Sequence, residues 1–168
     1  MKRLILVLLG FLPLPVGMSM HPSIRGVRWF PSVLIQQRWN PSFLYSLGAL
    51  FVWFLIGMLT IKLSKNSRES ILLLNTPAFI MLLLELYIYI VSTAPWRMLN
   101  WPFAVILGAH AFFYPIYGVV GIVYDIFIMH IFLGQGFANF VTSMAAFVCM
   151  AVVSHLGRVV AERRIKQS

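Results

Sequence analysis

The sequence predicts an all-α fold, a polytopic transmembrane helix bundle in which six spans are favoured and five are the alternative. Of its 168 residues, 61% are hydrophobic and only 10% are charged, whereas roughly a quarter of the residues of an ordinary soluble domain are charged. The apolar residues also form long runs, which neither a surface helix nor a half-buried strand would show. Both observations indicate a single integral membrane domain over residues 1–168, with lipid as its solvent.

Two apolar runs, residues 42–61 and 71–93, have the length of about 20 residues that a spanning helix needs. The first run, Leu4 to Met20, is shorter and contains Pro13 and Pro15, which membrane helices tolerate better than soluble ones. We expect it to be an uncleaved span. A cleaved signal peptide and an interfacial anchor are the alternatives, because a basic pair precedes the leucines, although no small-x-small cleavage site follows them.

The long apolar stretch 98–157 decides the number of spans. Asp125 is its only Asp, Glu, Lys or Arg, and the stretch can hold two long helices or three short ones. The three short helices would be roughly 98–116, 118–136 and 138–157. They require tight turns, which we expect at Tyr117–Gly118 and at residues 134–136, because glycine accepts left-handed backbone conformations at little cost.

The distribution of charge favours six spans over five, because cytoplasmic loops carry an excess of Lys and Arg. With six spans and a cytoplasmic N-terminus, nine basic residues face the cytoplasm and four face outside. The nine are Lys2, Arg3, Lys62, Lys65, Arg68, Arg158, Arg163, Arg164 and Lys166. With five spans, the C-terminal cluster moves outside and residues 125–135 become an interfacial or re-entrant piece.

Residues 21–41 form the one sizeable segment that we expect outside the hydrocarbon. The segment mixes aromatic and basic residues, a composition typical of the headgroup region, and this predicts an interfacial linker on the outer surface. The net charge of +9 is spread over loops and tail, so we interpret it as span orientation and contact with anionic lipid rather than nucleic-acid binding. Cys149 is the only cysteine and lies on a predicted span, so no internal disulfide is expected.

Ionisable groups at membrane depth are the candidate functional residues, because they are costly in hydrocarbon and usually face protein or water. Glu85 lies on the third predicted span, with Tyr89 one turn later. His110 begins a polar stripe that continues at Tyr114, and Asp125 is the lone carboxylate of its stretch. For each residue, a structural hydrogen bond between helices competes with a role in handling an ion, a proton or a substrate.

Small residues predict one close contact between helices. Gly118 and Gly121 share a helical face with Asp125, so a neighbouring helix can come close beside that carboxylate. The last predicted span offers a matching face of small and hydroxylic side chains, which includes Ser143 and Ala146. We expect these two helices to be packed partners.

A family resemblance occurs in the same region. Ile116-Tyr117-Gly118, the run from Gly121 to Asp125, and Leu133-Gly134 resemble the glycine, tyrosine-aspartate, leucine-glycine segment of the rod-shape-determining MreD proteins. The resemblance implies a six-span bacterial plasma-membrane protein that is not an enzyme and associates with the cell-wall elongation machinery. The glycines are three apart here rather than four, and the segment lies near the C-terminus rather than in the first half of the chain.

The motifs of the common enzyme classes do not occur in the sequence. It has no paired-carboxylate site, no His-x-x-x-His, no phosphate-binding glycine loop and no nucleophile elbow, so neither catalysis nor a cofactor or metal is expected. We expect a non-catalytic, multi-pass plasma-membrane scaffold or subunit that contacts the bilayer and other membrane proteins, with a role in cell shape or the cell wall. The alternative is a small transporter or an ion-coupled, solute-binding subunit, in which Glu85, Asp125 and His110 would line one polar cavity.

Overall fold

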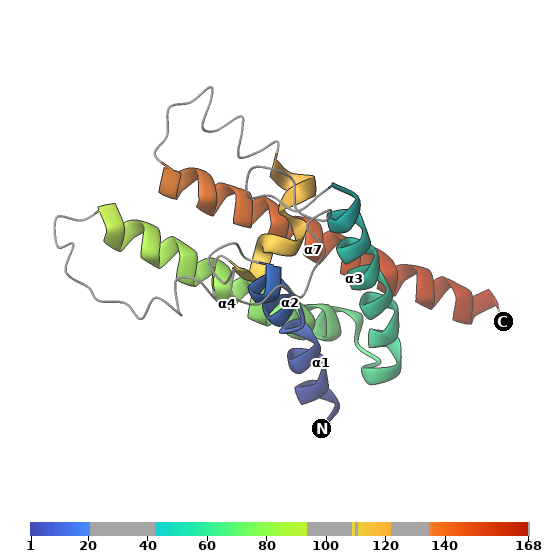
Figure 1. Ribbon diagram of the computed structural model, residues 1–168. Coiled ribbons are helices and arrows are strands. Elements are labelled where there is room, and N and C mark those ends of the chain that lie inside the picture. The colour runs from blue at the N-terminus through green and yellow to red at the C-terminus, as the bar shows by residue number, and fades with distance from the viewer. Residues whose placement is uncertain (21–42, 94–108, 110, 122–134, 168) are drawn as a thin grey trace.

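The computed structural model describes residues 1–20, 43–93, 109, 111–121 and 135–167 (Figure 1). Within these residues the chain is helical and contains no β-strand. The elements are α1 (Lys2–Gly10), α2 (Pro13–Met20), α3 (Phe43–Leu63), α4 (Ser67–Thr93), the 3-10 helix η3 (Tyr114–Ile116) and α7 (Gln135–Gln167).

Three of these helices, α3, α4 and α7, are long and apolar enough to cross a membrane. The prediction of a transmembrane helix bundle is therefore confirmed to that extent. The helices α3 and α4 coincide closely with the predicted spans 42–61 and 71–93. The helix α7 is longer than the predicted span 138–157 at both ends. The interfacial linker predicted over residues 21–41 lies outside the described part of the chain.

The N-terminal run is two short helices rather than one continuous span. Neither proline at its centre has a backbone N–H, so the carbonyl four residues before each loses its helical donor. Those carbonyls accept tighter bonds instead, from Leu12 N to Leu9 O at 3.1 Å and from Leu14 N to Phe11 O at 3.0 Å. The resulting turn separates α1 from α2, and each helix is too short to span a bilayer alone.

The described residues also do not support six continuous spans. The predicted tight turn at Tyr117–Gly118 is wrong, because residues 111–121 form one short apolar helix that tightens at η3 and continues past it. Tyr117 has helical backbone angles, φ −59° and ψ −25°. The turn expected at residues 134–136 is also corrected in part, since α7 already begins at Gln135.

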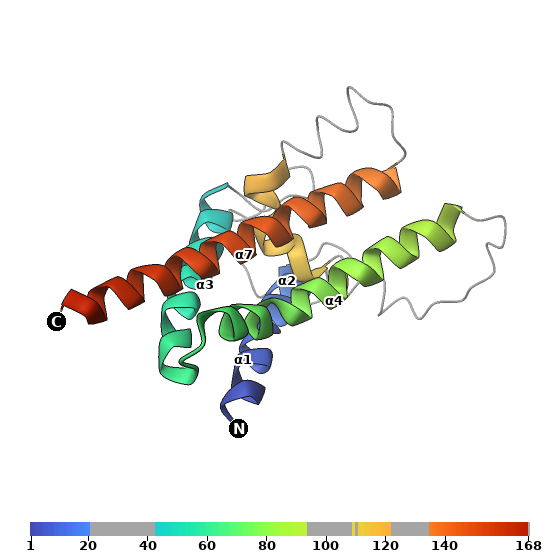
Figure 2. The same ribbon diagram turned by 180° about the vertical axis from the view of Figure 1, so that it is seen from behind.

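The long helices α3, α4 and α7 form the centre of the bundle (Figures 1 and 2). The chain runs in opposite directions along α4 and α7, which lie beside each other in both views, and α3 crosses α7. The crossing occurs at two glycines: a side chain on Gly57 would meet the backbone of Ser154, and one on Gly157 would meet the backbone carbonyl of Phe54. Neither position can hold a Cβ atom without separating the helices, so these glycines set the close approach.

The core lies between these three helices and the 111–121 segment. It contains Leu50, Trp53, Ile56, Leu74, Ala78, Leu82, Phe112, Phe113, Tyr114, Ile116, Tyr117, Val120, Ala146 and Met150. Gly17 of α2 packs directly against the carbonyl of Ala111, which Pro115 leaves without its usual helical donor. The proline therefore leaves this buried carbonyl outside the helical hydrogen-bond pattern, and only a glycine on the neighbouring helix fits beside it.

Candidate functional site

The structure describes only some of the polar residues that the sequence singles out. Glu85 is buried on α4, with 8% of its surface exposed, and Tyr89 is half-buried on the same helix. Tyr114 is buried in η3 with 2% exposed, beside the core. His110 and Asp125 lie outside the described residues, so their expected convergence with Glu85 stays a prediction.

The small-residue positions contact two different helices. The backbone N–H of Gly118 donates to the Ser46 hydroxyl of α3 at 3.0 Å. One residue earlier, the Tyr117 hydroxyl lies 2.6 Å from the hydroxyl of Ser143 on α7, one turn before the fully buried Ala146. Gly121 is half-buried at the end of the short helix. The segment therefore packs between α3 and α7, and it uses hydroxyl groups at both contacts.

The most extensive polar cluster was not among the sequence candidates: it surrounds Arg158 of α7. Only 1% of Arg158 is exposed, and it is the largest of the fully buried side chains described. Its guanidinium donates from Nη1 to the Ser64 carbonyl at 2.9 Å and from Nη2 to the Lys65 carbonyl at 3.2 Å. Nη1 also lies within 3.3 Å of the Thr60 hydroxyl and 3.4 Å of the Ser70 hydroxyl.

The position of these acceptors explains why a charged group is buried here. Ser64 and Lys65 directly follow the last residue of α3, where helix carbonyls lack intrahelical donors and the helix dipole is negative. A guanidinium placed there satisfies two carbonyls and a partial charge together. Because Thr60 lies on α3 and Ser70 on α4, a single side chain of α7 connects all three long helices.

The charge of Arg158 is balanced on its own helix. Its Nε donates to Glu162 at 2.6 Å, one turn later, and the Glu162 side chain is 35% exposed. A second ion pair, Arg3–Glu69 at 2.5 Å, joins the start of α1 to the first turn of α4. The Arg3 side chain is 80% exposed, so this second pair stabilises the fold little.

A smaller polar contact lies one turn from Arg158 along α7. The Asn75 side-chain amide donates to the Ser154 hydroxyl at 3.0 Å, and Ser154 donates to its own helix at the carbonyl of Ala151, 3.0 Å away. Asn75 lies on α4 two residues before Pro77, and only 6% of it is exposed. Together with Arg158, this contact gives α7 a row of hydrogen-bonding side chains along the face that meets α3 and α4.

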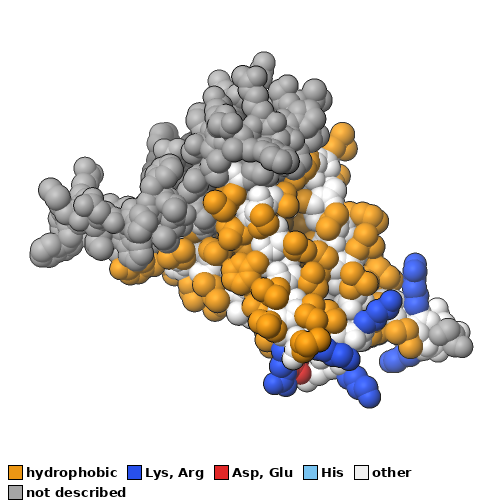
Figure 3. Space-filling view, turned by 60° about the horizontal axis from the view of Figure 1, so that its bottom comes forward, with side chains coloured by type: hydrophobic (Ala, Val, Ile, Leu, Met, Phe, Trp, Pro, Cys, Tyr) orange, Lys and Arg blue, Asp and Glu red, His pale blue; other side chains and the backbone are white. Residues whose placement is uncertain are grey.

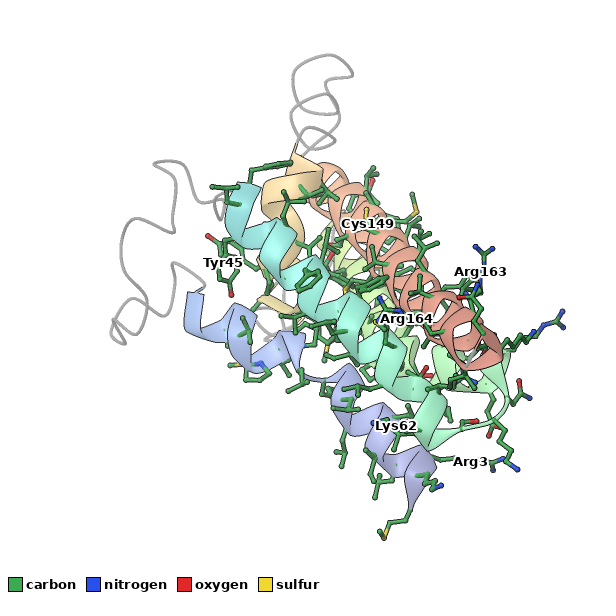
Figure 4. All side chains as sticks on the ribbon, turned by 90° about the vertical axis from the view of Figure 1, so that its right-hand side faces the viewer. Arg3, Tyr45, Lys62, Cys149, Arg163 and Arg164 are labelled. Atoms are coloured by element: carbon green, nitrogen blue, oxygen red, sulfur yellow. The ribbon has the colours of Figure 1, made fainter. Side chains whose placement is uncertain are left out.

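The lysines and arginines of the described residues gather at one end of the bundle (Figure 3). The end comprises the start of α1, the turn between α3 and α4, and the last turns of α7, and we call it the basic end. It holds nine basic residues and two acidic ones, Glu69 and Glu162, for a net of seven positive charges. Figure 4 shows Arg3 and Lys62 there, and Tyr45 toward the other end of α3.

The length of the bundle between its two ends matches a bilayer. At about 1.5 Å per helical residue, the seventeen steps from Tyr45 to Lys62 on α3 span about 26 Å. The nineteen steps from Arg68 to Tyr87 on α4 span about 29 Å. Both lengths are close to the hydrocarbon thickness of about 30 Å, so tyrosines and cations lie where an interface would be.

Comparisons of the chain with protein-family models, with curated proteins and with solved structures found no match. We therefore infer function from the contacts between helices described above. Within the described residues, no group of three or more His, Cys, Asp or Glu side chains lies close enough to hold a metal ion.

The sequence contains a spacing that is typical of an ion pair at Arg158, but composition and charge count alone do not reveal that this residue is buried. Arg158 directly follows Gly157 and precedes Glu162 by one helical turn, which is the spacing of a helical ion pair. The charge count placed it with the exposed cations that orient spans. The structure instead buries it, because the acceptors that stabilise it come from two other helices.

Proposed function

We propose that this chain is a non-catalytic scaffold or subunit of a membrane complex, held in the plasma membrane by several crossings. The observation that carries the proposal is how the described buried polar side chains are used. Arg158, Asn75, Tyr117 and Ser46 each bond to a residue of another helix, so their polarity serves helix association. Contacts of this kind favour a fixed architecture over a moving carrier.

The proposed topology places both termini in the cytoplasm. Its support is the basic end, which joins the first turn of α1, the α3–α4 turn and the end of α7 on one side of the bundle. Because α4 ends and α7 begins near the opposite end, the chain between them crosses the membrane an even number of times or not at all. A total of six crossings stays a proposal, and its two further crossings would lie within residues 94–134 with their turn elsewhere than at Tyr117–Gly118.

The partner proposed is another integral membrane protein, and the process is cell shape or cell-wall elongation. The resemblance of residues 116–134 to the MreD segment supports this assignment of process. The residues of that segment that the structure describes pack inside the bundle, at Tyr117 and Gly118. They would stabilise the subunit rather than touch its partner, which we expect on a lipid-facing surface.

A photo-crosslinking experiment on whole cells tests the scaffold proposal. Benzoylphenylalanine is placed in turn at Leu55 of α3, Leu83 of α4 and Val152 of α7, which are all exposed. A scaffold should give one defined protein adduct from one or two of the positions, and the remaining position serves as the matched control. Lipid adducts alone at all three positions would overturn the proposal.

A transporter or ion-coupled subunit is the second candidate, because Glu85 is a carboxylate buried inside a spanning helix. Glu85→Gln and Asp125→Asn keep side-chain size but cannot carry a negative charge. The scaffold proposal predicts that both variants fold and complement a gene deletion. Normal folded yield with lost complementation in either variant would instead support transport.

A further inference from the structure

Each long helix has a stripe of exposed apolar side chains that meets a cation at the basic end. Members of a stripe are three, four or seven residues apart, so they share one helical face. The stripes are Phe51, Leu55, Leu59 and Lys62 on α3; Arg68, Leu72, Phe79 and Leu83 on α4; and Val148, Val152, Leu156 and Arg163 on α7.

We propose that Lys62, Arg68 and Arg163 form a basic collar that binds the headgroup phosphates of anionic phospholipids in the first lipid shell. The collar cations continue the surfaces that acyl chains would cover, so a lipid lying along a stripe ends with its phosphate beside a cation. All three side chains are exposed, as binding of this kind requires. The proposal depends on the chain spanning a bilayer, and not on the proposed scaffold role.

Charge at the basic end makes anionic lipid the expected occupant. Both acidic side chains there are already bonded to arginines, Glu69 to Arg3 and Glu162 to Arg158. Among the described residues, no further carboxylate lies at the basic end to neutralise the remaining cations. Long Lys and Arg side chains at helix ends can extend along apolar surface to the headgroup level, and each collar cation stands at the end of such a surface. A soluble acidic protein could satisfy the charges, but it would leave the apolar part of each stripe uncovered.

The chain provides a matched control for position. Lys2, Lys65 and Arg164 are also exposed at the basic end. Arg164 lies about 80° or more round α7 from the apolar members of its stripe and about 100° from Arg163. Lys2 lies on α1, outside the three stripes, and Lys65 is in the turn between α3 and α4. Removing these three charges lowers the net charge as much as removing the collar does. A general surface potential would respond equally to both sets, whereas contact with individual lipids would respond only to the collar.

The experiment measures lipid selectivity of the full chain in phosphatidylcholine vesicles. Electron spin resonance gives the association constant of spin-labelled phosphatidylglycerol relative to spin-labelled phosphatidylcholine. We expect wild type to prefer phosphatidylglycerol by about five-fold at low salt, as cations near an anionic headgroup would give, and to lose most of this preference at high salt. The triple variant K62Q/R68Q/R163Q should fall to nearly equal association, and K2Q/K65Q/R164Q should keep the wild-type preference.

Three outcomes would overturn the proposal: equal loss in both triple variants, no loss in either, or a wild type without preference. Helix content by circular dichroism and a single peak in gel filtration establish that each variant is folded. Folding should survive in both, because none of the six side chains takes part in a hydrogen bond or ion pair within the described residues.

Discussion

Replacing Arg158 tests whether its buried network stabilises the bundle. Arg158→Ala removes all five contacts of the guanidinium and leaves a cavity where the largest fully buried side chain was. Removing one partner of a buried ion pair costs about 3 to 5 kcal/mol in soluble proteins. Because the Glu162 side chain is 35% exposed and stays hydrated, leaving it unpaired costs less than leaving a fully buried carboxylate unpaired. The cavity adds to the cost. We expect a loss of about 3 to 5 kcal/mol for Arg158→Ala.

Two further substitutions separate charge from volume. Arg158→Met keeps most of the volume but leaves the Ser64 and Lys65 carbonyls without their donor, for an expected cost of about 1 to 3 kcal/mol. Arg158→Lys keeps the charge but cannot reach both carbonyls with a planar fork, and we expect a similar cost of about 1 to 3 kcal/mol. Glu162→Gln is the control, at under about 1 kcal/mol, because its carboxylate is partly solvated.

The measurement is the free energy of unfolding in mixed detergent micelles, followed by circular dichroism as the fraction of denaturing detergent rises. The expected order of loss is Ala, then Met and Lys, then the Glu162 control. Buried ion pairs in soluble proteins are sometimes replaced by apolar residues without loss. An Arg158→Met variant as stable as wild type would therefore refute the reasoning, since it would show that the network only offsets the cost of burying the charge.

Three smaller changes test the remaining contacts by the same assay. Gly57→Ala should cost about 1 to 3 kcal/mol, because the new methyl group meets the backbone of α7. At Gly48 a methyl group meets nothing within 4 Å, so Gly48→Ala should stabilise α3 by up to about 1 kcal/mol. Effects of the same sign would contradict the crossing geometry. Tyr117→Phe and Ser143→Ala should show a coupling of about 0.6 kcal/mol in a double-mutant cycle, and additive effects would exclude the hydrogen bond. Asn75→Leu should change stability by less than about 1 kcal/mol, and a larger loss would show that its contact with α7 contributes more than an average interhelical bond.

The sequence predicted the parts of the fold that depend on the bilayer. The helices α3 and α4 followed from run length, because a spanning helix must contain about 20 apolar residues whatever it packs against. The extension of α7 to Gln167 did not follow, because outside the lipid a helix is stabilised by contacts such as the Arg158–Glu162 pair. Apolar run length carries no information about that pair.

The turn predicted at Tyr117–Gly118 failed for a related reason. Glycine permits a turn but also permits close approach of a neighbouring helix, and the sequence cannot say which applies. Here the backbone of Gly118 lies within hydrogen-bonding distance of Ser46 while it stays helical. In the same way, nothing in the chain pairs Gly57 with Gly157 until the crossing of α3 and α7 is known. The candidate site depended on such pairings, and its main residue was therefore missed.

The glycine crossing and the buried arginine are adjacent parts of one contact, which gives the last prediction. Thr60 lies one turn after Gly57 and donates to the Gly57 carbonyl at 2.7 Å, and Arg158 directly follows Gly157. Lipid provides little hydrophobic drive between helices, so close packing and hydrogen bonds must hold them together. A methyl group on Gly57 would move α3 away from α7, and would therefore also lengthen the bonds from Arg158 to Thr60 and Ser64.

The effects of Gly57→Ala and Arg158→Met should therefore not add. Once the helices are separated, little of the network remains for the second substitution to remove, so the double variant should be more stable than the sum of the single losses predicts. We expect a coupling of at least about 1 kcal/mol in a double-mutant cycle, which is above the scatter of about 0.5 kcal/mol for independent sites. Gly48→Ala combined with Arg158→Met is the control and should be additive, because a Cβ atom at Gly48 would meet nothing within 4 Å. Additivity in both cycles would show that the crossing and the arginine stabilise the bundle independently.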